Sequence, residues 1–240
     1  MRLRLSSGLL AVLLISICGA FADPAGAVEG GGSITGTIRY DGVPPKPVQL
    51  EISKDRGACG IHPLYDQALL VGPDGGIANV VVTIPGRKGG APPKLGRVVR
   101  FEQKGCEYTP HVAVFPAGST VEVINSDGIL HNIHTEALAN PVLDMAQPGF
   151  KKTIRIRIAK PEAIKVTCDA HNWMEGWWYA ASNSYYAITD VHGHYTMNNV
   201  PPGTYDLQVW QEKLGVKLRQ VTVKPGASTV ADFTLAPQHK

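Results

Sequence analysis

The sequence predicts an all-β protein. Short runs of alternating apolar and polar residues recur along the chain, and Gly, Pro, Asn and Asp bound them, which is the pattern of β-sandwiches and barrels. The 240 residues include 26 Gly and 18 Pro. No stretch shows sustained helical periodicity. The chain is long enough for one large or two small β-rich domains.

Ten segments have the composition and alternation of strands, and turn residues separate them. The pairs Pro44-Pro45, Pro92-Pro93 and Pro201-Pro202 fall between these segments, as expected of residues that central strands exclude. The predicted strands are 34–40, 80–84, 97–102, 111–115, 120–125, 153–158, 163–168, 185–189, 205–210 and 219–223.

The N-terminus predicts export. Residues 1–22 have a basic start at Arg2 and Arg4, an apolar run and a small-residue end, as in a secretory signal, with cleavage after Ala22 or Ala27. The apolar run is too short for a mature membrane anchor. Lipidation at Cys18 ranks second, because the bulky Ile17 precedes it. We therefore expect a periplasmic or extracellular protein with no membrane span.

The charge balance argues against nucleic acid as a partner. Lys and Arg number 23 and Asp and Glu number 20, and the predicted signal contains two of the basic residues, so the mature net charge is about +1. A nucleic-acid-binding domain would carry a larger basic excess.

The mature chain keeps an odd number of cysteines: Cys59, Cys106 and Cys168. In an oxidising compartment at least one of them must be free, metal-bound or paired to another chain. Cys59 and Cys106 both lie in loop-like, Gly-containing contexts, so the economical solution pairs them in a disulfide. Cys168 then remains as the lone thiol.

The segment from Cys168 to Met174 predicts a copper site. Strand alternation places Cys168 on the same inward face as Ile164 and Val166, at the end of its strand. His171 and Met174 follow at intervals of three, and thiolate, imidazole and thioether together suit copper. Zinc does not use methionine and no second cysteine pair is present, so copper is favoured over zinc.

A second imidazole is available upstream, in residues 125–134. If this segment is extended, His131 and His134 face opposite ways, so alternation allows only one of them as a ligand. His131 is favoured. His134 ranks behind it, as does His111.

Two segments resemble the cupredoxins of the plastocyanin and amicyanin kind. Residues 108–134 are similar to the strand pair that ends in their first histidine ligand, and residues 166–174, VTCDAHNWM, resemble their C-x-x-H-x-x-M ligand loop. The resemblance implies a Greek-key β-sandwich. It also implies His131, Cys168, His171 and Met174 as copper ligands, with Asn132 tethering the cysteine loop.

A second resemblance concerns residues 188–235, whose D-x-x-G-x-Y turn and following PPGTY are similar to carboxypeptidase regulatory-like, or transthyretin-like, sandwiches. Residues 33–52 resemble the first strands of the same module. We expect N-terminal strands at 33–65, a copper domain at 66–182 and the regulatory-like sandwich at 183–240. A discontinuous sandwich that contains the copper domain as an insertion also fits.

These features predict an exported protein that binds one copper ion and transfers single electrons between redox proteins, and no enzymatic activity. A copper carrier or storage protein without redox turnover is the alternative. A small copper enzyme would need an open coordination position, which a methionine ligand argues against.

Overall fold

The computed structural model describes residues 30–86 and 98–237. Within these residues the regular structure is strand apart from one short helix, α1 (Arg56–Cys59), which confirms the predicted all-β fold. The predicted signal at residues 1–22 lies outside the described residues. Within the described part of the chain, no helix is long and apolar enough to cross a membrane.

Strands from both ends of the described chain form one β-sandwich, which we call the terminal sandwich. One of its sheets contains β1 (Gly32–Tyr40), β13 (His194–Val200), β16 (Ser228–Val230) and β17 (Phe233–Leu235). The other sheet has the order β12 (Tyr186–Ile188), β2 (Val81–Thr83), β14 (Gly203–Gln211), β15 (Gly215–Val223). Ile34, Ile77 and Leu207 belong to the apolar core of this sandwich and are fully buried.

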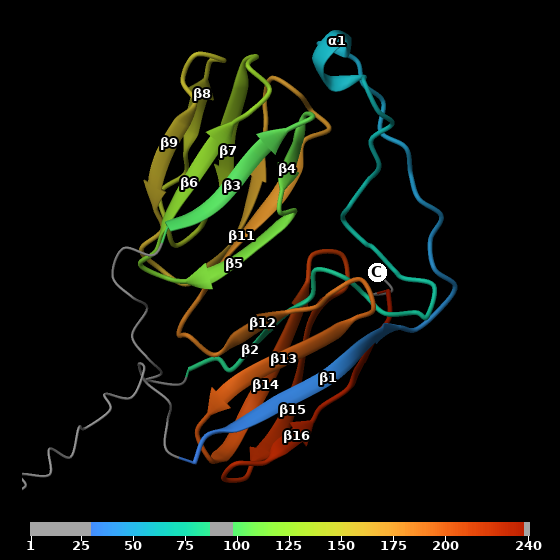
Figure 1. The fold of residues 1–240 in the computed structure, drawn as a ribbon, viewed down its shortest axis with the longest axis vertical. Coiled ribbons are helices and arrows are strands. Elements are labelled where there is room, and N and C mark those ends of the chain that lie inside the picture. The colour runs from blue at the N-terminus through green and yellow to red at the C-terminus, as the bar shows by residue number, and fades with distance from the viewer. Residues whose placement is uncertain (1–29, 87–97, 238–240) are drawn as a thin grey trace, which may run out of the picture.

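Residues 98–181 form a second sandwich, the inserted sandwich, which lies above the terminal sandwich in Figure 1. One sheet has the order β5 (Val112–Pro116), β11 (Glu175–Ala181), β10 (Glu162–Thr167), β7 (His131–Glu136), β8 (Asp144–Gln147). The other has the order β4 (Glu107–Thr109), β3 (Val98–Lys104), β6 (Thr120–Asn125), β9 (Thr153–Arg157). Alternation along β9 and β10 buries Ile154, Ile156, Ile164 and Val166 between the two sheets.

The two sandwiches do not divide at residue 66, where the sequence led us to place a domain boundary. β2 lies within the range expected for the copper domain, but Val82 pairs with Ala187 of β12 and with Val209 of β14. All three residues of β2 are buried, as suits a short apolar strand with a neighbour on each side. The terminal sandwich is therefore discontinuous, and among the described residues the first strand of the inserted sandwich is β3, from Val98.

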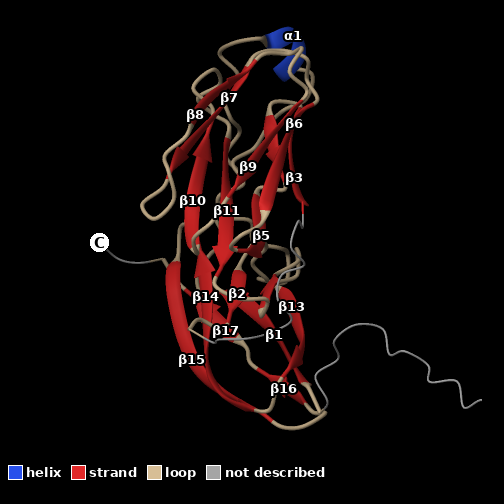
Figure 2. Ribbon diagram, turned by 90° about the vertical axis from the view of Figure 1, so that its left-hand side faces the viewer, coloured by secondary structure: helices blue, strands red, loops and turns tan. Residues whose placement is uncertain are grey.

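Residues 41–80 connect β1 to β2 and form what we call the arm. In Figures 1 and 2 the arm rises to α1, at the end of the inserted sandwich that is farther from the terminal sandwich, and returns. The expected disulfide between Cys59 and Cys106 is present and ties α1 to the β3–β4 turn. The arm therefore carries residues of the first 80 positions to the far end of the inserted sandwich.

A polar and aromatic seam joins the two sandwiches, which are stacked end to end in Figure 2. Glu212, just after β14, lies 2.5 Å from Nε2 of His111 and accepts a hydrogen bond of 2.8 Å from the indole of Trp177. The rings of Trp177 and Tyr179 pack on Trp210 of β14, with centroids 5.0 and 5.3 Å apart. These contacts hold one end of the inserted sandwich against the terminal sandwich.

Candidate metal centre

Three predicted ligand residues converge at the far end of the inserted sandwich. Sγ of Cys168 lies 3.9 Å from Nδ1 of His131 and 3.8 Å from Nδ1 of His171, and the two Nδ1 atoms are 3.1 Å apart. Cys168 is the only free cysteine in the described residues. All three side chains are buried, with 0% exposure for both histidines and 2% for Cys168.

Local chain geometry explains how residues spaced by three converge. β10 ends at Thr167, so Cys168 leaves the strand on its inward face. The backbone N–H of His171 then donates to the carbonyl of Cys168 at 3.2 Å, and that of Met174 donates to the carbonyl of His171 at 3.0 Å. Two successive tight turns thus return the chain toward the same point. His131 enters from the adjacent strand, as the first residue of β7.

The outer nitrogen of each histidine contacts a carboxylate. Nε2 of His131 lies 2.9 Å from Oδ2 of Asp127, and Nε2 of His171 lies 2.9 Å from Oδ2 of Asp55. An ionised carboxylate only accepts hydrogen bonds, so Nε2 carries the proton in both rings and Nδ1 carries the lone pair. Two lone pairs that face each other at 3.1 Å, beside a thiolate, need a proton or a cation between them. The donor set of two imidazoles and one thiolate therefore fits copper.

The pKa shifts of these groups also fit a metal-binding cluster. Burial lowers the pKa of His131, but hydrogen bonds with Asp127 and Cys168 outweigh burial and raise this pKa to about 9. Burial raises the pKa of Cys168, but hydrogen bonds from His131 and from nearby backbone N–H groups hold it below its ordinary value. Burial lowers the pKa of His171, against its hydrogen bond with Asp55. In the metal-free site, the proton that the two facing Nδ1 atoms need therefore belongs to His131, and the thiol of Cys168 beside it has a lowered pKa.

The hydrogen bonds around Cys168 involve Asn132 and Tyr108. The backbone N–H of Asn132 donates to Sγ of Cys168 at 3.3 Å, so Asn132 contacts the cysteine through its main chain. Its side-chain amide instead donates to Asp144 at 2.7 Å. The hydroxyl of Tyr108 lies 2.9 Å from the carbonyl oxygen of Asn132 and 3.0 Å from that of Thr167. Tyr108 therefore ties β7 to the end of β10.

The other candidate residues lie in different positions. His134 faces away from the three donors and contacts the exposed Asp169 at 3.0 Å, as alternation along β7 requires. His111 lies in the seam with Glu212, beside the start of β11, where its carbonyl accepts a hydrogen bond from the backbone N–H of Trp177 at 2.7 Å, and it is not part of the three-donor cluster. Met174 is the last residue of the ligand loop and is buried, with 2% exposure. Its role as the fourth ligand stays a prediction.

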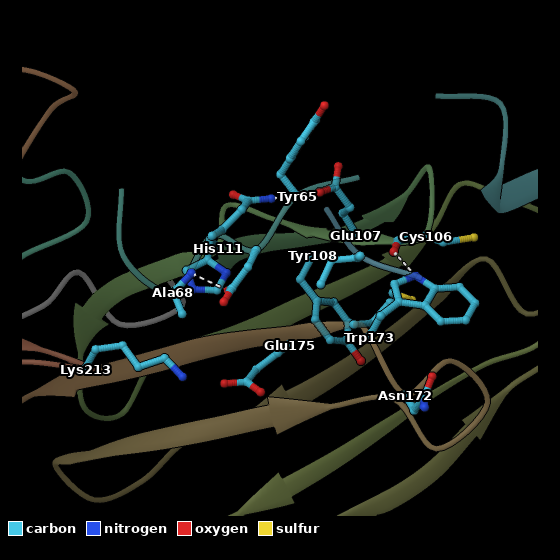
Figure 3. A pocket seen from close by; sticks show the side chains of 14 residues that line it. Tyr65, Ala68, Cys106, Glu107, Tyr108, His111, Asn172, Trp173, Glu175 and Lys213 are labelled. Carbon is cyan, nitrogen blue, oxygen red and sulfur yellow. Dashed lines mark hydrogen bonds between the residues drawn. The ribbon is translucent and has the colours of Figure 1, made fainter. Parts of the chain in front are cut away.

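A pocket of about 190 Å³ lies beside the centre, between the arm and the inserted sandwich (Figure 3). Trp173 lines it, donates from its indole to the carbonyl of Cys106 at 3.3 Å, and contacts the ring of His171 at a centroid distance of 5.1 Å. Met174 also lines this pocket, but His131, Cys168 and His171 do not. The pocket is therefore not an opening onto the three donor atoms.

Sequence reasoning missed both carboxylates. Asp127 lies four residues before His131, in the segment 125–134 that was considered only for its histidines. Asp55 lies 116 residues before His171 and has left-handed backbone geometry with φ of 48°. No local pattern marks Asp55 as a partner of the ligand loop, because the arm and the disulfide bring it there.

Comparisons with known proteins give partial matches. A family model described as polysaccharide lyase family 4, domain II matches residues 161–231, a range that runs from β10 through β16 and so includes strands of both sandwiches. No curated protein matches the chain. The resemblance of residues 188–235 to a transthyretin-like module stays a prediction.

The solved structures that resemble this chain include copper proteins. A Cu-containing nitrite reductase from Thermus scotoductus SA-01 is 24% identical with a TM-score of 0.31, over 40% of this chain and 24% of the reductase. A purple cupredoxin from Nitrosopumilus maritimus is 18% identical with a TM-score of 0.29, over 35% of this chain and 99% of that protein. A Cu(I) amicyanin variant is 18% identical with a TM-score of 0.32, over 41% of this chain and 97% of that protein. This chain thus spans about a quarter of the reductase, and functional conclusions rest on the side chains of the centre.

Proposed function

We propose that the inserted sandwich binds one copper ion through His131, Cys168 and His171, and that the protein passes single electrons between redox proteins. The observation that carries this proposal is the convergence of the two Nδ1 atoms and Sγ, all within 4.8 Å of one another, in a buried position. Bound copper supplies a Cu(II)/Cu(I) couple, and a thiolate with two imidazoles accommodates both states.

The surroundings of the donors support electron transfer rather than catalysis or copper delivery. Both histidines are fully buried, and their outer nitrogens are already bonded to Asp127 and Asp55. A catalytic copper site keeps an open position for substrate, and a copper carrier must let its ion leave. The arm also covers the His171 side and is held there by the Cys59–Cys106 disulfide. A disulfide is in keeping with the oxidising exported compartment that we propose for this protein.

Copper titration of the purified protein tests the proposal. We expect one equivalent of Cu(II) to give an intense thiolate-to-copper absorption band and narrow hyperfine splitting in the electron paramagnetic resonance spectrum. Cys168→Ser should lose the band and keep the β-sheet circular dichroism. A Cys168→Ser protein that keeps the band would reject Cys168 as the ligand. Reversible voltammetry with copper retained in both states separates electron transfer from copper storage.

We further propose that Met174 supplies a weak fourth ligand. Met174→Leu should keep copper bound and raise the reduction potential, because the axial thioether tunes the potential more than the affinity. The measurement is voltammetry of the copper-loaded variant beside the wild type. Loss of copper from Met174→Leu would show that Met174 holds the ion rather than tunes it.

A further inference from the structure

Each of the two histidines in the centre donates its outer N–H to a carboxylate. This arrangement is more than burial requires, because a neutral backbone carbonyl would satisfy a buried imidazole N–H equally well. The structure instead places Asp127 on His131 and Asp55 on His171, both at 2.9 Å. Two negative charges therefore lie one imidazole ring away from the position between the Nδ1 atoms.

We propose that Asp127 and Asp55 are positioning residues that lower the reduction potential of the bound copper, so that the centre favours Cu(II). This inference rests on the proposed copper function. Cu(II) carries one more positive charge than Cu(I), so nearby negative charge stabilises the oxidised state more. A histidine that donates to a carboxylate is also a more basic ligand, which again favours the more highly charged ion.

The two carboxylates should not contribute equally. The side chain of Asp127 is only 9% exposed, and it also accepts backbone hydrogen bonds from Gly105 at 2.6 Å and Cys106 at 2.9 Å. The side chain of Asp55 is 40% exposed. Water screens the charge of Asp55 more strongly, so Asp127 has the larger effect on the potential.

The disulfide links the segments that carry these two carboxylates. Cys59 ends α1, four residues after Asp55, and the backbone N–H of its partner Cys106 donates to Asp127. The same bridge thus holds Asp55 over His171 and fixes the turn that orients Asp127. The arm thereby lets a segment that precedes the inserted sandwich adjust the electrostatics of its centre.

The same strand provides a matched control. His134, also on β7, pairs with Asp169 at 3.0 Å, but their side chains are 39% and 51% exposed and neither belongs to the three-donor cluster. Replacing Asp169 with Asn removes the same charge from the same kind of pair, at a histidine that binds no copper in this proposal.

The experiment measures the reduction potentials of copper-loaded wild type, Asp127→Asn, Asp55→Asn and Asp169→Asn. For Asp127→Asn we expect the ratio of Cu(II) to Cu(I) affinity to fall about tenfold, which raises the potential by about 59 mV for a one-electron couple. Asp55→Asn should give a smaller rise. Asp169→Asn should give the smallest rise, because Asp169 follows Cys168 but bonds no ligand histidine and its side chain is 51% exposed. Absorption and electron paramagnetic resonance spectra report whether the thiolate remains bound in each variant.

Unchanged potentials in Asp127→Asn and Asp55→Asn, with the charge-transfer band intact, would overturn this inference and leave the proposed function standing. An equal rise in Asp169→Asn would also overturn it, because the effect would then be one of general surface charge. A wild type without the band rejects the proposed function itself. If Asp127→Asn does not fold, Asp55→Asn decides, since Asn tolerates the left-handed backbone at position 55.

Discussion

The two sandwiches bury different kinds of side chain. The terminal sandwich buries an apolar core that includes Ile77 and Leu207, and its buried polar side chains, such as that of Gln211, are amides and hydroxyls. The inserted sandwich also has an apolar core, but it buries His131, His171 and several amides toward one end. Buried polar groups are costly unless they are paired, so their concentration at one end marks where the molecule has a function beyond folding.

The buried amides of the inserted sandwich organise the loops around the centre. Gln103 donates to Gln147 at 2.7 Å, and Gln147 in turn donates to the carbonyl of Lys151 at 3.0 Å. Asn125 donates to the carbonyl of Ile129 at 2.8 Å, which shapes the loop that leads into His131. The inserted sandwich thus differs from the terminal sandwich in using part of its core for the three-donor cluster of His131, Cys168 and His171.

The largest effect should distinguish the two histidines of β7. His131→Ala removes a buried donor and should abolish tight copper binding, while His134→Ala changes an exposed pair with Asp169 and should leave the spectrum near that of the wild type. Copper titration followed by absorption and electron paramagnetic resonance measures both. Equal loss in the two variants would indicate an additional imidazole ligand, and the reverse result would contradict the observed register of β7.

Loss of the Cys59–Cys106 disulfide should have the next largest effect. Replacing Cys59 and Cys106 together with Ser should lower the free energy of unfolding by about 2–5 kcal/mol, since the bridge closes a long loop in the unfolded chain. Denaturant unfolding of copper-free protein measures this. Cys168→Ser is the control, because it removes a thiol but no bridge. A thiol assay of the unfolded, unreduced mature protein should find Cys168 alone, and three thiols would contradict the pairing.

A core substitution in the terminal sandwich should reduce stability without changing the copper spectrum. Leu207→Ala should cost about 2–5 kcal/mol, because Leu207 is fully buried in the apolar core. Leu218→Ala, at a position that is 58% exposed, should cost much less. Thermal unfolding measures the stability of both variants, and the absorption spectrum of the copper-loaded proteins reports on the centre. A changed spectrum in Leu207→Ala would show that the terminal sandwich shapes the centre, and would contradict separate roles for the two sandwiches.

The features that could be predicted from the sequence are those that depend on residues close together in the chain. Cys168, His171 and Met174 lie on one short loop after an alternating strand, so their proximity could be inferred from spacing. The pairing of Val82 with Ala187 and Val209 could not be inferred from the sequence. It joins strands on either side of an 84-residue insertion, and nothing in the residues of β2 indicates that an insertion follows. Asp55 was missed for the same reason, since its position depends on the disulfide and on the path of the arm.

The smallest predicted effect concerns Glu162, at the opposite end of β10 from Cys168. Its carboxylate accepts backbone hydrogen bonds from Leu138, Ala139 and Asn140, in the loop between β7 and β8. Burial raises the pKa of Glu162, but these donors outweigh burial and hold it below the ordinary value of 4.5. A lowered pKa in the folded state stabilises the protein above the unfolded-state pKa, and this stabilisation disappears as the pH falls through the folded-state value.

Glu162→Gln should therefore reduce the free energy of unfolding at pH 7 by no more than about 1 kcal/mol, since solvent screens this partly exposed group. The difference from the wild type should shrink as the pH falls through the lowered pKa of Glu162, because the wild-type carboxylate then also becomes neutral. Urea unfolding across this range measures it, with Glu136→Gln as the control, because that carboxylate is 64% exposed and 4.0 Å from Lys165. A difference that stays constant with pH would mean that Glu162 acts through the shape of its hydrogen bonds and not through its charge.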